Sequence, residues 1–235
     1  MRVEIWSDVV CPWCYVGKRN FEAALGQFEH RDEVEVIWRA FELDPSAPPE
    51  REGDYSGHLA RKYGMSVAQA QTMIETMTAT AAKAGAVLDF GKARPGNTFD
   101  AHRLIHLAGV RGVQHAVKER FLRATFSEGE PIGDRQALLR LAVDAGLPRD
   151  EAAAVLESDA YAEDVRAEES LALDLGITAV PFFVIDRTFG VPGAQPPDVI
   201  LSALERAWER KASRPLEIAG PAAGTIGCEG DTCAV

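Results

Sequence analysis

The chain has 235 residues, of which 36 are acidic and 25 are basic, so its formal net charge is −11. This charge argues against nucleic acid and anionic membrane surfaces as partners, because both repel an acidic protein. The sequence contains neither an apolar run long enough to cross a bilayer nor a basic-then-apolar leader, and we therefore expect a soluble, cytoplasmic protein.

The N-terminal residues predict a strand, a helix and a second strand. The first strand covers residues 2–7, and the apolar pattern over 15–25 indicates a helix that begins within the preceding Cys-Pro-Trp-Cys segment. Pro12 suits the first helical position, where its missing N–H is not needed. A second strand is expected over residues 34–41, and a proline-rich loop over 44–49 closes this βαβ unit.

Residues 55–176 show apolar side chains at helical spacing and no strand pattern. Ser66, which a glutamine follows three residues later, predicts a capping box. Asn97 and Asp134 are expected to cap two further helices, and another helix is expected over residues 161–175, where a glycine follows. We therefore expect this stretch to be an all-helical insertion.

Strand character returns over residues 181–186, and a short partner over 189–191 completes a hairpin. Pro196 and Pro197 then open a last helix. The order β-α-β, helical insertion, β-β-α predicts an α/β protein with a thioredoxin fold and an inserted all-helical domain. The expected units are a thioredoxin-like domain over 1–54 and 177–212, a helical insertion over 55–176, and a C-terminal tail over 213–235.

Cys11 and Cys14 are the strongest chemical signal in the chain. Two cysteines two residues apart, in a strand-to-helix setting, are typical of a reversible dithiol/disulfide couple. Free N–H groups and the positive end of the dipole at a helix N-terminus favour a thiolate, so we expect a lowered pKa for Cys11. Cys11 would attack a disulfide, and Cys14 would resolve the mixed disulfide. A structural disulfide or half of a zinc site is the alternative interpretation.

Pro181 is the second candidate active-site residue. A proline that enters a strand lacks a donor for the sheet ladder, which suggests a turn or a cis bond. A proline that merely occupies the first position of a strand is the simpler alternative. In the thioredoxin arrangement a cis-proline loop faces the dithiol, where the backbone of Val180 would pair with an extended substrate chain.

Other polar residues near these motifs have ordinary interpretations beside the functional ones. Lys18 lies one helical turn after Cys14, where it would favour the thiolate, but a solvated surface charge is the preferred interpretation. Asp8 is interpreted as a strand-end residue rather than a base. His102 and His106 have the i, i+4 spacing of a metal-binding pair but lack a third ligand, so no metal site is expected.

The C-terminal tail carries a second cysteine pair, Cys228 and Cys233, and Gly230 between them allows a loop that a disulfide closes. The linker from the last helix has about 15 residues and, at up to about 3.3 Å each, spans roughly 50 Å. We expect this pair to relay electrons between Cys11/Cys14 and an outside partner, since tethering gives a high effective concentration. A scavenging or zinc-binding tail is the alternative.

Four segments together resemble the DsbA-like family of the FrnE type: residues 8–14, 97–104, 180–184 and 193–195. The resemblance extends over essentially the whole chain. It implies a thioredoxin fold with a helical insertion and the activity of a protein disulfide oxidoreductase. Its substrates would be protein or small-thiol disulfides, and a cellular thiol would serve as reductant.

The resemblance also implies that Asn97 and His102 lie near the dithiol. Strongly oxidising members of the family carry histidine where this chain has Trp13, so we expect a less acidic Cys11 and a less oxidising couple. A sister group is similar to glutathione transferase kappa and 2-hydroxychromene-2-carboxylate isomerase, and there serine generally replaces Cys11. Both cysteines are present in this chain, which favours redox exchange.

Two alternatives stay open from the sequence. One is a glutathione-dependent isomerase or transferase on the same scaffold. The other is a zinc-binding module that uses all four cysteines. No bound cofactor is expected beyond the redox-active disulfide, with glutathione as a candidate co-substrate.

Overall fold

The computed structural model describes residues 1–51 and 53–212, so Cys228 and Cys233 lie outside the described residues. The elements in chain order are β1 (Arg2–Ser7), α1 (Pro12–Gln27), η1 (Arg31–Glu33), β2 (Glu35–Ala40), α2 (Tyr55–Tyr63), α3 (Val67–Lys83), α4 (Phe99–Val110), α5 (Gln114–Arg123), η2 (Ala124–Glu128), α6 (Arg135–Asp144), α7 (Arg149–Leu156), α8 (Ala162–Asp174), β3 (Phe182–Ile185), β4 (Phe189–Pro192) and α9 (Pro197–Ala212). None of the described helices has the length and apolarity needed to cross a membrane.

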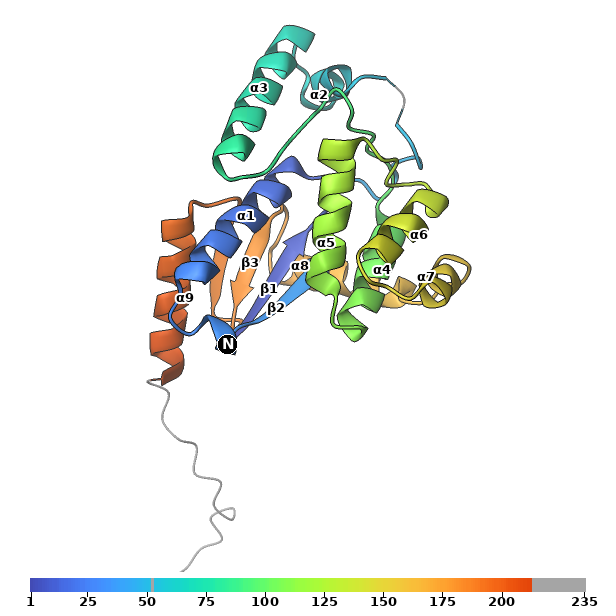
Figure 1. Cartoon of the computed structure of the whole chain (residues 1–235). Helices are drawn as coiled ribbons and strands as arrows, with labels where there is room; N and C mark the ends of the chain where they lie inside the picture. The colour runs from blue at the N-terminus through green and yellow to red at the C-terminus, as the bar shows by residue number, and fades with distance from the viewer. Residues whose placement is uncertain (52, 213–235) are drawn as a thin grey trace, which may run out of the picture.

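The described strands form one sheet in the order β2-β1-β3-β4 (Figure 1). Strand β2 runs parallel to β1, whereas β3 is antiparallel to both β1 and β4. Residues 55–176 contribute helices to the fold and no strand. The predicted α/β thioredoxin fold with a helical insertion is therefore confirmed.

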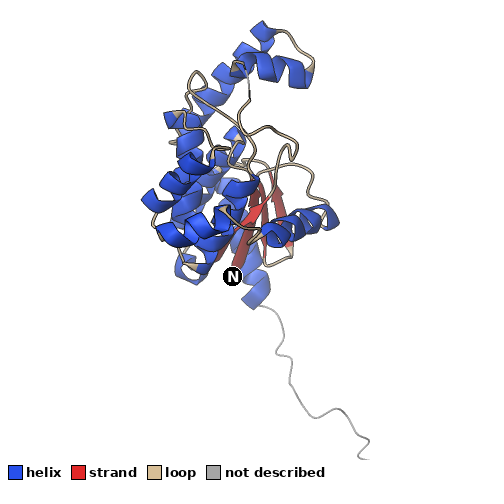
Figure 2. Cartoon of the chain, turned by 90° about the vertical axis from the view of Figure 1, so that its right-hand side faces the viewer, coloured by secondary structure: helices blue, strands red, loops and turns tan. Residues whose placement is uncertain are grey.

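The alternation of side chains along β1 decides which helix covers which face of the sheet. Val3 and Ile5 pack into the main core with α1 and α9, whereas Trp6 points to the other face, where its indole N–H donates to the Glu168 carbonyl of α8 at 3.0 Å. This period-two pattern buries both faces of a central strand. Helices consequently flank the sheet on both sides (Figure 2).

Helices α2 and α3 lie beyond the end of the sheet at which α1 begins (Figure 1). Their apolar residues form a second core with Tyr15 and Val16 from the first turns of α1, to which α2 contributes Leu59 and α3 contributes Ile74. The start of α1 is therefore enclosed by the helical insertion.

The predicted helix caps were right in two cases and wrong in one. Ser66 forms the capping box of α3, and the carboxylate of Asp134 accepts from the third residue of α6. Asn97, however, lies one residue before the N-cap of α4, which is Thr98. Its Oδ1 accepts from the Phe99 N–H at 3.0 Å, so the side chain stabilises the entry to the helix from outside it.

Candidate active site

The dithiol lies at the N-terminus of α1, as the sequence predicted. Cys11 is the N-cap residue, Pro12 occupies the first helical turn, and the Cys14 N–H donates to Cys11 Sγ at 3.3 Å. Both thiols are free and buried, with 4% of Cys11 and 1% of Cys14 exposed. The sulfur of Cys11 thus takes the place of the oxygen that usually caps a helix.

The loop before β3 faces this dithiol. The peptide bond between Val180 and Pro181 is cis, and the Cys11 thiol donates to the Val180 carbonyl at 3.6 Å. A Cβ atom on Gly17 of α1 would lie 2.8 Å from Cγ of Pro181, so the missing side chain lets the loop approach the helix. The structure therefore brings Cys11, Val180 and Pro181 together.

The sequence predicted a lowered pKa for Cys11, but in this structure, with both thiols reduced, the pKa is raised. The hydrogen bond shared with Cys14 raises the pKa of the Cys11 thiol well above its ordinary value, and burial raises it further. The backbone N–H of Cys14 acts in the opposite direction but does not outweigh these effects. Local helix-end geometry therefore does not by itself make Cys11 acidic.

Asp8 lies three residues before Cys11 and is fully buried. Its Oδ2 accepts from the Leu43 N–H at 2.8 Å, and its Oδ1 lies 3.4 Å from Nε2 of His102. Burial acts to raise the pKa of Asp8, but the neighbouring His102 ring and the Leu43 N–H together outweigh it and hold that pKa below its ordinary value. Asp8 is thus both a strand-end residue that fixes a neighbouring loop and an ionised group near Cys11.

Lys118 of α5 is a buried cation beside the dithiol that the sequence analysis missed. It is fully buried, its ammonium donates to the Ser7 carbonyl at 2.9 Å, and its Nζ lies 5.7 Å from the centre of the Trp38 ring. Burial lowers the pKa of Lys118 to about 8, against the attraction of negative charge on Cys14 and Asp8. A lysine three residues before Phe121, on the apolar face of its helix, is the signal that would have revealed it.

Lys18 is not the surface charge that the sequence favoured. Its side chain is 1% exposed, and its ammonium lies 2.6 Å from Glu22 Oε1 and 2.6 Å from Glu119 Oε2. Two carboxylates therefore neutralise it, and their attraction offsets the free-energy cost of removing the ammonium from water.

The remaining predicted residues divide between the site and its supports. Asn97 donates to the Pro45 carbonyl at 3.3 Å, so its side chain stabilises the neighbouring loop. Trp13 is 39% exposed beside the dithiol. His106 lies 3.1 Å from Glu168, whereas His102 lies beside Asp8. The two imidazoles therefore contact different carboxylates. Within the described chain, no three histidine, cysteine or acidic side chains are grouped for a metal ion.

This arrangement can accept and release two electrons together with protons. The two sulfurs supply the electrons, while the ionised Asp8 and the buried Lys118 lie in electrostatic reach of them. An ammonium near a sulfur stabilises the thiolate, and a nearby carboxylate destabilises it.

Comparison with known proteins agrees with this description. The DSBA-like thioredoxin domain family matches residues 2–205. The uncharacterized protein YwbO of Bacillus subtilis is 33% identical over 213 residues, which cover 90% of this chain and 99% of that protein. The crystal structure of a probable DsbA oxidoreductase, SCO1869 from Streptomyces coelicolor, is 46% identical, with a TM-score of 0.87 over 100% of this chain and 99% of that one. The cytosolic disulfide reductase DsbM from Pseudomonas aeruginosa, at 18% identity and a TM-score of 0.62, covers 89% of this chain and 100% of its own, and shares the fold.

Proposed function

The chain belongs to the DSBA-like thioredoxin domain family, and from this membership we propose that it is a thiol-disulfide oxidoreductase that works through Cys11 and Cys14. The observation that carries the proposal is the pair of free thiols at the start of α1, where Cys11 Sγ accepts from the Cys14 N–H and the Cys11 thiol donates to the Val180 carbonyl. A glutathione-dependent isomerase that uses serine would not need the second of these sulfurs.

The proposed exchange has two steps. The Cys11 thiolate attacks one sulfur of a substrate disulfide, forms a mixed disulfide and releases the other half of the substrate as a thiolate. Cys14, as thiolate, then attacks Cys11 Sγ, forms the Cys11–Cys14 disulfide and releases the second half. Two electrons pass from the protein to the substrate, and the two protons of the protein thiols end on the two released thiols. The reverse sequence oxidises a dithiol.

Cys11 must first lose the proton that its bond with Cys14 and its burial help it to keep. We propose that the ammonium of Lys118 supports this loss, because a positive charge stabilises whichever sulfur is ionised. The Cys14 N–H, which already points at Cys11 Sγ, contributes a further hydrogen bond to the thiolate.

The regeneration of the couple also belongs to this proposal. A cellular thiol in the cytoplasm, with glutathione as a candidate, would reduce the Cys11–Cys14 disulfide by the reverse exchange. The tail pair Cys228/Cys233, which lies outside the described residues, would relay electrons from such a donor or toward a protein substrate.

The test is to equilibrate the full chain in glutathione redox buffers and count free thiols by alkylation and mass spectrometry. We expect Cys11 and Cys14 to be lost and regained together, and the Cys14→Ser variant to accumulate a mixed disulfide on Cys11. The matched Cys228→Ser/Cys233→Ser variant should retain this reversible pair but turn over more slowly with protein substrates. If Cys11 and Cys14 stay reduced at every buffer ratio, the proposed function is wrong.

A further inference from the structure

Asp8 and His102 form a buried pair of ionisable side chains next to the dithiol segment. The exposed fraction is 0% for Asp8 and 1% for His102, and Nε2 of the ring lies 3.4 Å from Oδ1 of the carboxylate. Within the described chain, neither of these two atoms has a hydrogen-bond partner of good geometry. Because Oδ2 already accepts from the Leu43 N–H, Oδ1 and the ring face each other through charge.

The backbone holds Asp8 close to Cys11. The Cys11 N–H donates to the Asp8 carbonyl at 3.4 Å, which closes a turn over residues 8–11. In such a turn the first and the last Cα atoms lie within about 7 Å of each other. Negative charge on Asp8 therefore opposes ionisation of Cys11, and it adds to the larger effects of the Cys14 side chain and of burial, which raise the pKa of that thiol.

No other charged side chain pairs directly with Asp8 among the residues that the structure describes. The Lys118 ammonium donates to a backbone carbonyl and reaches Asp8 only through its longer-range charge. Glu42, within electrostatic reach of His102, pairs with Arg166 at 2.5 Å. The imidazole is therefore the one direct counter-charge that the described residues offer to this carboxylate.

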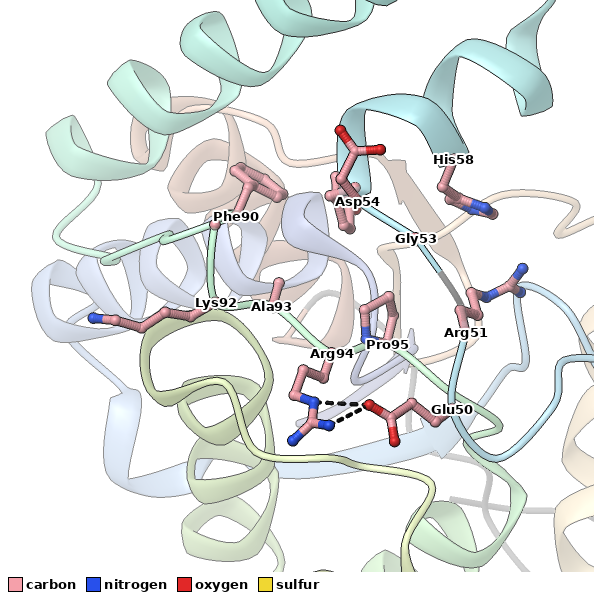
Figure 3. Close-up of a pocket in the computed structure, with 12 residues that line it drawn as sticks. Glu50, Arg51, Gly53, Asp54, His58, Phe90, Lys92, Ala93, Arg94 and Pro95 are labelled. Carbon is pink, nitrogen blue, oxygen red and sulfur yellow. Dashed lines mark hydrogen bonds and ion pairs between the residues drawn. The ribbon is translucent and has the colours of Figure 1, made fainter.

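Asp8 also adjoins a small cavity of about 40 Å³, whose other ionisable lining residues are Asp44, Arg51, Tyr55, His58 and Lys62. Arg51 is paired with Asp44. Figure 3 shows Arg51 and His58 on the wall of a larger pocket of about 680 Å³, whose described lining includes neither Asp8 nor His102. Burial lowers the pKa of His58, and nearby cations lower it further, so these side chains do not take the place of His102.

We propose that His102 is a positioning residue of the disulfide exchange: its protonated ring neutralises Asp8, so that the Cys11 thiolate forms beside a neutral pair rather than beside a bare carboxylate. The inference rests on the proposed function, since this thiolate is the one that attacks the substrate disulfide. The ring acts through Asp8, and no bond to it forms or breaks. Once the ring loses its proton, the carboxylate charge is uncompensated and the thiolate becomes less stable.

The test follows the rate at which iodoacetamide alkylates Cys11 in the reduced full chain, from about pH 5.5 to about pH 10. Fragmentation of the alkylated peptide by mass spectrometry separates Cys11 from Cys14. We expect His102→Gln to slow this alkylation about ten-fold near pH 6, which is the effect of one unit charge at about 10 Å with an effective dielectric constant of about 20. The factor should fall towards one as the pH rises and the wild-type ring loses its proton.

Asp8→Asn should give the opposite pH dependence. Asparagine still accepts from the Leu43 N–H but carries no charge. Near pH 6 the wild-type pair is neutral overall, so we expect equal rates; above the titration of the ring, Asp8→Asn should react about ten-fold faster than the wild type. In the double variant, His102→Gln should have no further effect, because a buried ring without a carboxylate partner stays neutral.

His106→Gln is the matched control. His106 lies one turn further along α4 and also faces a carboxylate, that of Glu168 at 3.1 Å. Arg39 pairs with the same carboxylate at 2.5 Å, so Glu168 keeps a counter-charge in this variant. We therefore expect His106→Gln to keep the wild-type alkylation profile.

The inference is wrong if His102→Gln and His106→Gln change the rate equally, or if the ratio of wild type to His102→Gln is the same at every pH. It is also wrong if His102→Gln slows alkylation as much in the Asp8→Asn background, because the ring would then act on Cys11 directly. Should His102→Gln not fold, Asp8→Asn decides alone, and a ratio to the wild type that does not change with pH contradicts the inference.

Failure of the proposed function gives a different result. The same proteins are mixed with 2-hydroxyethyl disulfide, which is neutral, and the oxidation of Cys11 and Cys14 is followed. If both thiols stay reduced although the alkylation profiles differ as expected, the proposed function is wrong while the charge compensation by His102 is confirmed. If the disulfide reacts but the variants show no pH-dependent ratios, the role of His102 is wrong and the proposed function is unaffected.

Discussion

Replacing Lys118 by methionine tests whether a buried amine of lowered pKa lies beside the dithiol. Methionine keeps the length and the apolar stem of the side chain and removes its charge. The difference between the ordinary lysine value of 10.5 and the value of about 8 in the folded protein corresponds to about 3 kcal/mol. Because Lys118 is fully buried, little of this is lost to screening by solvent.

The sign of the effect follows from proton binding. The folded protein releases the Lys118 proton near pH 8, whereas the unfolded chain holds it until about pH 10.5. Between these values the unfolded chain binds more protons, so the contribution of this group makes the folded state more stable as the pH rises. The cost of burying the charge is therefore largest below pH 8.

The assay is urea unfolding of the reduced wild type and of Lys118→Met at a series of pH values from about 7 to about 10. Groups other than Lys118 titrate in both proteins, so the informative quantity is the difference between their free energies of unfolding. We expect the wild type to gain about 2 to 3 kcal/mol relative to Lys118→Met across this range. A constant difference would show that the amine keeps an ordinary pKa, and the lowered pKa of Lys118 would be wrong. Lys83→Met, at an exposed position, supplies the reference for a constant difference.

Two further substitutions probe the contacts of the dithiol. Gly17→Ala would normally stabilise a helix by about 1 kcal/mol, but its Cβ would meet Pro181 at 2.8 Å, so we expect a loss of about 1 to 3 kcal/mol in urea unfolding and slower exchange with disulfides; a gain in stability would contradict the packing. Trp13→His places an imidazole beside Cys11, so we expect a lower pKa for that thiol and a more oxidising couple in glutathione buffers, whereas an unchanged pH profile of alkylation would contradict the role of position 13.

The sheet and the helices α1, α3, α4, α6, α8 and α9 could be predicted because their signals are local, whereas α2, α5 and α7 were not identified individually. The strand over 2–7 alternates its side chains, and the capping side chains of Ser66 and Asp134 bond to backbone within three residues. Asn97 was misplaced by one position because asparagine satisfies backbone N–H groups equally well from just outside a helix. Local pattern thus gives the elements but leaves a shift of one residue at their ends.

The charges around the dithiol could not be predicted in the same way. Lys18 and Lys118 are both lysines on amphipathic helices, and their burial depends on contacts with residues about a hundred positions away in the chain. Pairing with two carboxylates neutralises Lys18. In the described structure Lys118 donates only to a neutral carbonyl, so its positive charge still acts on the nearby sulfurs. No sequence pattern distinguishes these outcomes, because it does not say which elements meet.

The difference between Lys18 and Lys118 matters for function because the pKa of Cys11 is raised. The helix end supplies one N–H to the sulfur, and that single bond does not overcome the effects of burial and of the Cys14 side chain on the pKa of Cys11. A compensating positive charge comes from the helical insertion, where Lys118 lies on α5. The helical insertion therefore acts on the dithiol electrostatically through the buried ammonium of Lys118. Exchanging the insertion between relatives with the same Cys-Pro-Trp-Cys segment would for this reason change the acidity of the thiols.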